Sequence, residues 1–96
     1  MNTQKNLIVI SGGAGGIGQA CARTFKNHPI ILTDYSQEQV DEKVDILSKE
    51  GFDISGISCD ITDKNDIEKL TQYIADNGSL KALIHTAGVS GTVKDI

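Results

Sequence analysis

A glycine-rich segment, SGGAGGIG at residues 11–18, places the strongest constraint on how this chain folds. It follows a short apolar run, Leu7 to Ile10, and precedes residues with helical spacing. Glycine lets the backbone turn sharply and approach other groups closely, so five glycines in eight positions predict a tight turn between a strand and a helix. Three spacings overlap here: GxGxxG from residue 13, and GxxxGxG and GxxGxxG from residue 12. The segment alone leaves all three open.

Four short apolar segments predict strands that are buried on both faces, and such strands are typically parallel. Three are uninterrupted runs. The fourth surrounds Gly56, which lowers the strand propensity but permits close packing. The expected strands are Leu7 to Ile10, Ile30 to Leu32, Ile54 to Ile57 and Ala82 to Ile84.

Three segments between these strands carry apolar residues at the three- and four-residue spacing of helices. Pro29 prevents the first from continuing, and Ser36 with Gln39 resembles a capping box that starts the second. Gly51 and Gly78 are placed to end the second and the third. The expected helices are Ile17 to about Asn27, a second between Ser36 and Gly51, and a third between a cap at Thr62 or Asp63 and Gly78.

Strands and helices therefore alternate along the chain, which predicts a parallel sheet with helices on both faces. The expected fold is α/β, the N-terminal half of a Rossmann-type doubly wound sheet with four strands in the order 3-2-1-4 and three helices. Ile67, Leu70 and Ile74 of the third helix are expected to face inward. Residues 1–96 are interpreted as one partial domain, and the edge of the fourth strand is expected to invite self-association.

Composition excludes several classes of function. The formal net charge of -4 offers no basic face to nucleic acid. No apolar run approaches the roughly 20 residues of a membrane span, and the first residues do not resemble a signal peptide, so we expect a cytoplasmic chain with no membrane partner. Cys21 and Cys59 lie in no metal-binding pattern and are expected to be small buried groups.

The position of the glycine segment gives it a chemical meaning. After a strand and before a helix, its N–H groups and the helix dipole attract a negative pyrophosphate. The lysine and Ser/Thr ending of a P-loop is missing, which argues against a nucleotide triphosphatase. The sequence therefore predicts a dinucleotide site.

Asp34 is the candidate for binding the adenosine ribose. It ends the second strand, 22 residues after Gly12, close to the separation of about 20 typical of the ribose-binding acid. A 2'-phosphate would meet its negative charge without a neighbouring cation, so NAD(H) is favoured over NADP(H). Charge-assisted bonds contribute about 1.5 to 3 kcal/mol each, so this position alone would give roughly tenfold to hundredfold discrimination. The alternative is that Asp34 is a turn or cap residue.

The third and fourth strands end in further candidates at the same edge of the sheet. Asp60 is expected to bond the adenine amino group and Ile61 to pack on the ring, although Asp60 alternatively caps the third helix. Ala87 and Gly88 are small enough for a cofactor to approach closely. His85 has no carboxylate or nucleophile placed near it in the sequence, and a structural or packing role is favoured.

Taken together, these motifs resemble the N-terminal part of the short-chain dehydrogenase/reductase family. The TGxxxGIG signature of that family is matched by Ser11, Gly12, Gly16, Ile17 and Gly18, with serine in place of threonine. The resemblance implies that the loop wraps the pyrophosphate of NAD, that Ile17 touches it, and that Asp34, Asp60 and Ile61 hold the adenosine part. It favours the spacing from residue 12 that includes Gly16.

The Asn-Asn-Ala-Gly motif of the family is matched only at Ala87 and Gly88, because His85 and Thr86 replace the two asparagines. Gly15 and His85 lend some support to the extended branch of the family, which uses TGxxGxxG. The standard branch is preferred, since the Gly-Ile-Gly and Ala-Gly-Val sequences fit it together.

Catalysis in this family requires a serine and a Tyr-xxx-Lys pair beyond the fourth strand. Tyr35 is followed four residues on by Gln39, and Tyr73 by Asn77, so no catalytic residue is assigned. We expect the NAD(H)-binding part of an enzyme that transfers hydride reversibly between NAD(H) and an alcohol or carbonyl substrate, truncated and inactive alone. A non-catalytic nucleotide-binding or interaction module is the alternative, and a methyltransferase using S-adenosylmethionine is a third.

Overall fold

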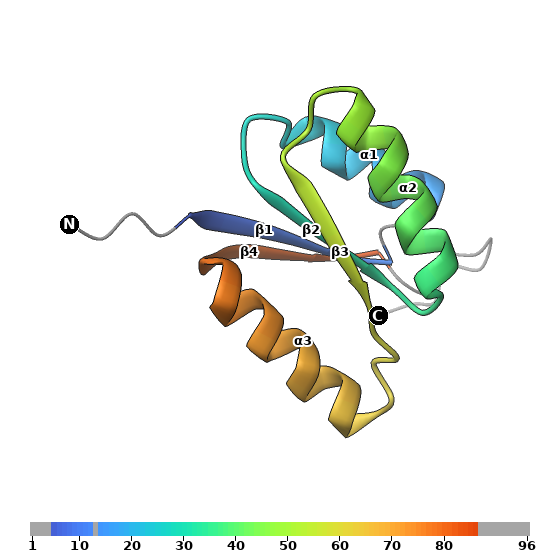
Figure 1. Cartoon of the computed structure of the whole chain (residues 1–96), viewed down its shortest axis with the longest axis vertical. Coiled ribbons are helices and arrows are strands. Elements are labelled where there is room, and N and C mark those ends of the chain that lie inside the picture. Colours follow the sequence, from blue (N-terminus) through green and yellow to red (C-terminus); the bar gives the residue numbers. More distant parts are fainter. Residues whose placement is uncertain (1–4, 13, 87–96) are drawn as a thin grey trace, which may run out of the picture.

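The computed structural model describes residues 5–12 and 14–86, in which strands and helices alternate (Figure 1). The strands are all parallel and lie in the order β3-β2-β1-β4, which confirms the predicted fold. The elements are β1 (Asn6–Ser11), α1 (Gly16–Thr24), β2 (Ile30–Asp34), α2 (Gln37–Lys49), β3 (Ile54–Ser58), α3 (Lys64–Asn77) and β4 (Ser79–His85).

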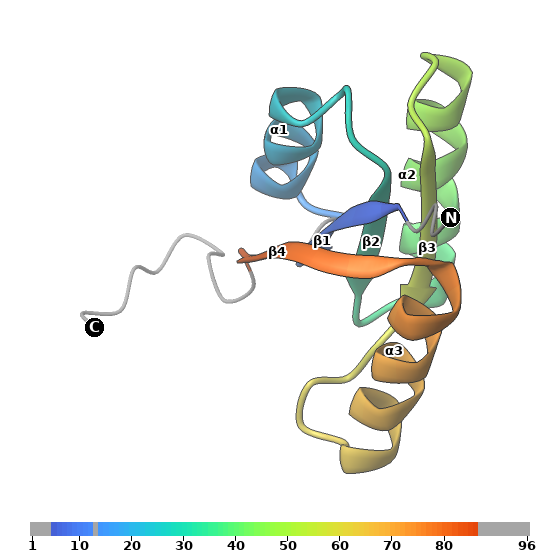
Figure 2. The same ribbon diagram turned by 90° about the vertical axis from the view of Figure 1, so that its left-hand side faces the viewer.

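The helices form a layer on each face of the sheet. Figures 1 and 2 show α1 and α2 on one face and α3 on the other. Alternate residues of β1 pack against the two helix layers, because successive side chains of a strand point to opposite faces of the sheet. Ile8 and Ile10 pack with residues of α1 and α2, whereas Leu7 and Val9 pack with Ile74 and its neighbours on α3.

Helix α3 covers its face of the sheet less completely than α1 and α2 cover the other face. Ile74 packs against the sheet. Ile67 lies on the same side of α3, where it lines the groove toward β4, so the expected inward direction holds, but Ile67 remains 43% exposed. The physical reason is visible in Figure 2, where the first turn of α3 stands away from the sheet and the last turn lies beside it. Leu80 and Leu83 of β4 are exposed beside this helix. An apolar groove of about 560 Å³ lies between α3 and β4.

Helix boundaries follow the local signals with one exception. Gly51 and Gly78 follow α2 and α3 with φ angles of 96° and 157°, values that favour glycine. The first helix ends at Thr24 rather than near Asn27, because the N–H of Phe25 bonds the carbonyls of both Cys21 and Ala22 and a turn then leads to the next strand.

Gly56 allows α2 to approach the sheet closely. A Cβ atom at this position would lie 2.5 Å from Val40 Cγ1, 2.8 Å from the carbonyl oxygen of Leu32 and 2.9 Å from Val44 Cγ2. These distances are shorter than van der Waals contact. The close packing expected of Gly56 is therefore confirmed, and β3 extends over it to Ser58.

Candidate dinucleotide site

The glycine loop leaves β1 through a tight turn. Gly12 has φ 76°, a conformation that glycine adopts at little cost, and its carbonyl accepts the N–H of Gly15 at 3.3 Å. Gly15 is extended (φ -82°, ψ 176°), and α1 begins at the next residue. The turn therefore brings the start of α1 to the carboxyl edge of the sheet.

The first turn of α1 has no side-chain cap. In α2 the hydroxyl of Ser36 accepts the N–H of Gln39, and in α3 the carboxylate of Asp63 accepts that of Asn65, but α1 begins at glycine. Among the described residues, Gln19 is the first in α1 whose N–H donates to a backbone carbonyl, that of Gly15. The donors ahead of it are available to an anion, which the helix dipole also attracts.

The predicted loop residues differ in their surroundings. Gly18 is buried, as expected where a helix packs closely on a strand, and Ile17 is 51% exposed beside the loop. A Cβ atom at Gly16 would meet nothing within 4 Å, so the protein itself does not require glycine there. Gly13, Ala87 and Gly88 lie outside the described residues.

Asp34 ties the end of β2 to the glycine loop. Its Oδ2 accepts the N–H of Ala14 at 3.0 Å, and its Oδ1 accepts that of Tyr35 at 2.7 Å. Asp34 is not the cap of α2, since Ser36 has that place. A carboxylate oxygen accepts more than one hydrogen bond, so both oxygens retain lone pairs for ribose hydroxyls. The bond to Ala14 was not foreseen from the sequence.

A hollow of about 90 Å³ brings several predicted residues together. This volume is below the roughly 300–1,000 Å³ of a typical small-molecule pocket, so the hollow suits one part of a larger ligand. Tyr35 and Cys59 were not predicted to belong to it. Burial raises the pKa of the Cys59 thiol, which therefore stays protonated. The lining residues are Ser11, Gly12, Asp34, Tyr35, Cys59, Asp60 and Ile61.

Asp60 has one carboxylate oxygen engaged locally. Its Oδ1 accepts the hydroxyl of Thr62 at 2.6 Å and the N–H of Thr62 at 2.9 Å, and these bonds lower the pKa of Asp60. The alternative that Asp60 caps the third helix was wrong, because Asp63 does so. Within residues 5–12 and 14–86, Oδ2 of Asp60 has no hydrogen-bond partner and is left for a ligand.

The end of β4 is bonded to the start of the loop. The imidazole Nδ1 of His85 lies 3.2 Å from Ser11 Oγ, and Thr86 bonds the carbonyls of Ser11 and Gly12. His85 is exposed and makes a polar cross-strand contact, so the structural or packing role favoured for it stays a prediction. Thr86 is a residue that sequence reasoning missed, and the signal available was its hydroxyl at a position where the family has asparagine.

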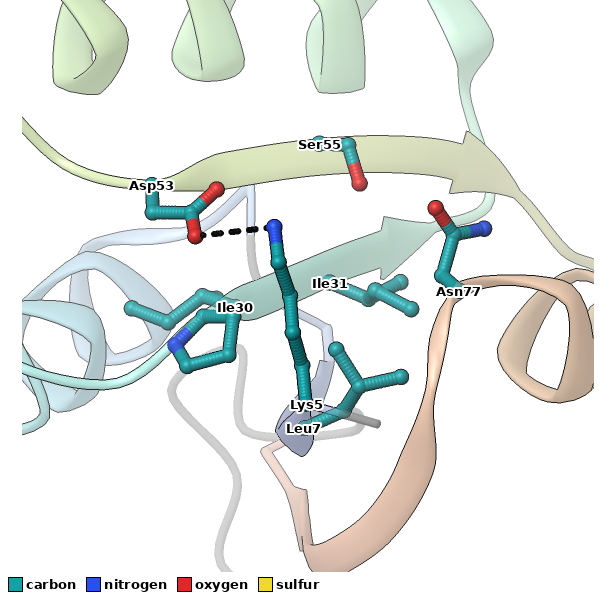
Figure 3. A pocket seen from close by; sticks show the side chains of 8 residues that line it. Lys5, Leu7, Ile30, Ile31, Asp53, Ser55 and Asn77 are labelled. Carbon is teal, nitrogen blue, oxygen red and sulfur yellow. Dashed lines mark hydrogen bonds and ion pairs between the residues drawn. The ribbon is translucent and has the colours of Figure 1, made fainter. Parts of the chain in front are cut away.

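A second hollow, of about 40 Å³, lies at the opposite end of the sheet (Figure 3). Lys5 and Asp53 form an ion pair of 3.4 Å beside it, and both side chains are more than half exposed. Ligands of open α/β sheets bind at the carboxyl ends of the strands, whereas this hollow lies at their amino ends. Asp53 therefore provides a control for Asp34.

Two features are absent from the part of the chain that the structure describes. None of its helices is long and apolar enough to cross a membrane. None of its His, Cys, Asp and Glu side chains gather in threes as metal ligands would.

Comparison with known proteins identifies the family. Residues 6–96 match the family described as short chain dehydrogenase, and the chain therefore belongs to this family. The resemblance drawn from the loop and the strand ends is confirmed.

Two relatives come from Bacillus subtilis (strain 168). The uncharacterized oxidoreductase YxbG is 36% identical over 89 residues, which cover 90% of this chain and 33% of the relative. The short-chain dehydrogenase/reductase homolog YusS is 27% identical over 94 residues, which cover 94% of this chain and 86% of that protein. The chain spans about a third of the length of the first curated relatives, 33% and 36%.

Solved structures share the fold. A short-chain dehydrogenase/reductase from Burkholderia phymatum in complex with NAD is 21% identical with a TM-score of 0.73, and the match covers 86% of this chain and 31% of the other. A variant of actinorhodin polyketide ketoreductase with NADPH is 22% identical with a TM-score of 0.81, and the match covers 99% and 40%. Structural neighbours thus carry either nicotinamide dinucleotide.

Proposed function

We propose that this chain binds NAD(H) across the carboxyl ends of β1, β2 and β3. The observation that carries the proposal is the uncapped start of α1 directly behind the turn at Gly12, because it offers N–H donors to a pyrophosphate. In the whole protein this part would serve reversible hydride transfer between NAD(H) and an alcohol or carbonyl substrate. We infer that residues 1–96 form a single partial domain. We also infer a cytoplasmic location, which the free thiols of Cys21 and Cys59 support because disulfides are rare in that compartment.

The preference for NAD(H) over NADP(H) rests on charge. Asp34 and Asp60 both line the hollow that would receive the adenosine part, and no lysine or arginine among the described residues lines it. A 2'-phosphate would therefore bring negative charge against two carboxylates without compensation. The 2'-hydroxyl of NAD would instead donate to Asp34.

We expect the chain to bind NADH tenfold to hundredfold more tightly than NADPH, and Asp34→Asn to reduce this preference to threefold or less. The substitution removes the charge and leaves one of the N–H donors of Ala14 and Tyr35 without its carboxylate oxygen. Calorimetric titration of both cofactors measures the ratio. Asp53→Asn, at the other end of the sheet, should leave the ratio unchanged. A preference for NADPH in the unmodified chain would contradict the assignment.

The isolated chain is expected to bind cofactor without turning over. Tyr35 is 74% exposed at the hollow and Tyr73 packs against Leu7, Val9 and Ile31, and neither has a lysine four residues on. Hydride transfer measured by NADH absorbance, with simple ketones as substrates, tests this expectation. Turnover would rule out the non-catalytic nucleotide-binding or interaction module. The reason to consider that module is that neither Tyr35 nor Tyr73 has a lysine four residues on.

A further inference from the structure

Thr86 makes three hydrogen bonds to two successive carbonyls at the start of the glycine loop. Its N–H donates to the carbonyl of Ser11 at 2.8 Å, which continues the parallel ladder one residue beyond the pair Ser11 and His85. Its hydroxyl lies 2.8 Å from the same oxygen and 2.9 Å from the carbonyl oxygen of Gly12. One side chain at the end of β4 thus contacts the backbone where β1 becomes the loop.

Of these two carbonyls, that of Gly12 matters more for the binding of an anion. It accepts from the N–H of Gly15 at 3.3 Å as well as from Thr86, and both bonds hold it inside the turn. A carbonyl oxygen that turned outward would present partial negative charge to a pyrophosphate. A hydroxyl has a single proton, which Thr86 shares between the two carbonyls, so the side chain restrains both.

We propose that Thr86 is a positioning residue of the dinucleotide site, and that its hydroxyl sets the loop for the pyrophosphate by restraining the carbonyls of Ser11 and Gly12. The inference rests on the proposed function. Loss of the hydroxyl leaves neither carbonyl without a hydrogen bond. The carbonyl of Ser11 still accepts the N–H of Thr86, and the carbonyl of Gly12 still accepts the N–H of Gly15. The effect should therefore fall on binding more than on folding.

The test compares Thr86→Val, which keeps the shape and removes the hydroxyl, with Thr86→Ser, which keeps the hydroxyl. We expect the valine variant of the 96-residue chain to bind NADH about five- to tenfold more weakly and the serine variant to stay within about twofold. In the free protein, amide hydrogen exchange of Gly15 should be faster in the valine variant, while that of Val9 in the core of β1 should not change. A purely structural role would accelerate both.

Unchanged NADH affinity in the valine variant, or an equal loss in the serine variant, would overturn the role of Thr86 and leave the proposed function intact. Failure of the unmodified chain to bind NADH would overturn the proposed function, and the positioning role with it. Should the valine variant not fold, as judged by its thermal unfolding, Thr86→Ala takes its place in the same comparison with serine.

Discussion

Replacing Gly16 with alanine is expected to leave the chain folded and to weaken NADH binding about a hundredfold. Among the described residues, a Cβ atom at Gly16 meets nothing within 4 Å beyond its chain neighbours and its own helix backbone. Alanine in a helix costs less than glycine, so the unfolding temperature should stay or rise. The same methyl group would occupy the space where the pyrophosphate approaches the first turn of α1. Loss of two charge-assisted hydrogen bonds accounts for an effect of this size. Calorimetry and thermal unfolding measure the two quantities separately.

The matched control is Gly15→Ala, one residue earlier. A Cβ atom there would lie 3.7 Å from the carbonyl oxygen of Gly12, an ordinary contact, and the extended backbone of Gly15 suits alanine. Affinity should remain within about threefold of that of the unmodified chain. If both variants lost binding equally, the spacing that includes Gly16 would not be the functional one, and if neither did, the pyrophosphate would lie elsewhere.

Gly56→Ala is expected to destabilise the fold by about 3 kcal/mol, a large part of the 5–15 kcal/mol typical of a folded domain. The added methyl group would overlap the side chains of Val40 and Val44 and the carbonyl oxygen of Leu32, and a backbone oxygen in a central strand cannot move aside. The midpoint of urea unfolding should fall accordingly, without a change in the slope of the transition.

Val44→Ala in the Gly56→Ala background tests this explanation. It removes one of the two side-chain overlaps and leaves the overlap with Leu32, so stability should recover in part. The combined variant should be more stable than the sum of the two single changes predicts, because the two positions are in contact. Additive losses would show that steric overlap at β3 is not the cause.

The sequence was sufficient for the architecture because its signals are local or follow general rules. Apolar runs located the strands, and Ser36, Gly51 and Gly78 located helix ends. The order of the strands followed from the doubly wound arrangement expected when strands and helices alternate, with right-handed crossovers and helices on both faces. The exposure of Ile67 was not predicted, since helical spacing shows which residues share a face but not how much of the helix the sheet reaches.

The candidate site was predicted less completely. The sequence led to Gly12, Asp34 and Asp60, which line one hollow, because each lies at or shortly after the carboxyl end of a strand. It did not lead to the bonds from Asp34 to Ala14 or from Thr86 to Gly12. Both hydrogen bonds depend on the register between neighbouring strands and on the path of the loop. No short sequence pattern indicates either of these features.

With a dinucleotide bound as proposed, the missing cap of α1 would link the amount of folded protein to the supply of that ligand. A side-chain cap contributes about 1 kcal/mol, and a bound pyrophosphate would replace that contribution for α1. Cofactor at a hundred times its dissociation constant would add about 2.7 kcal/mol to the stability of the chain. In a cell, where proteases remove unfolded chains, the lifetime of this protein would then rise and fall with the dinucleotide pool.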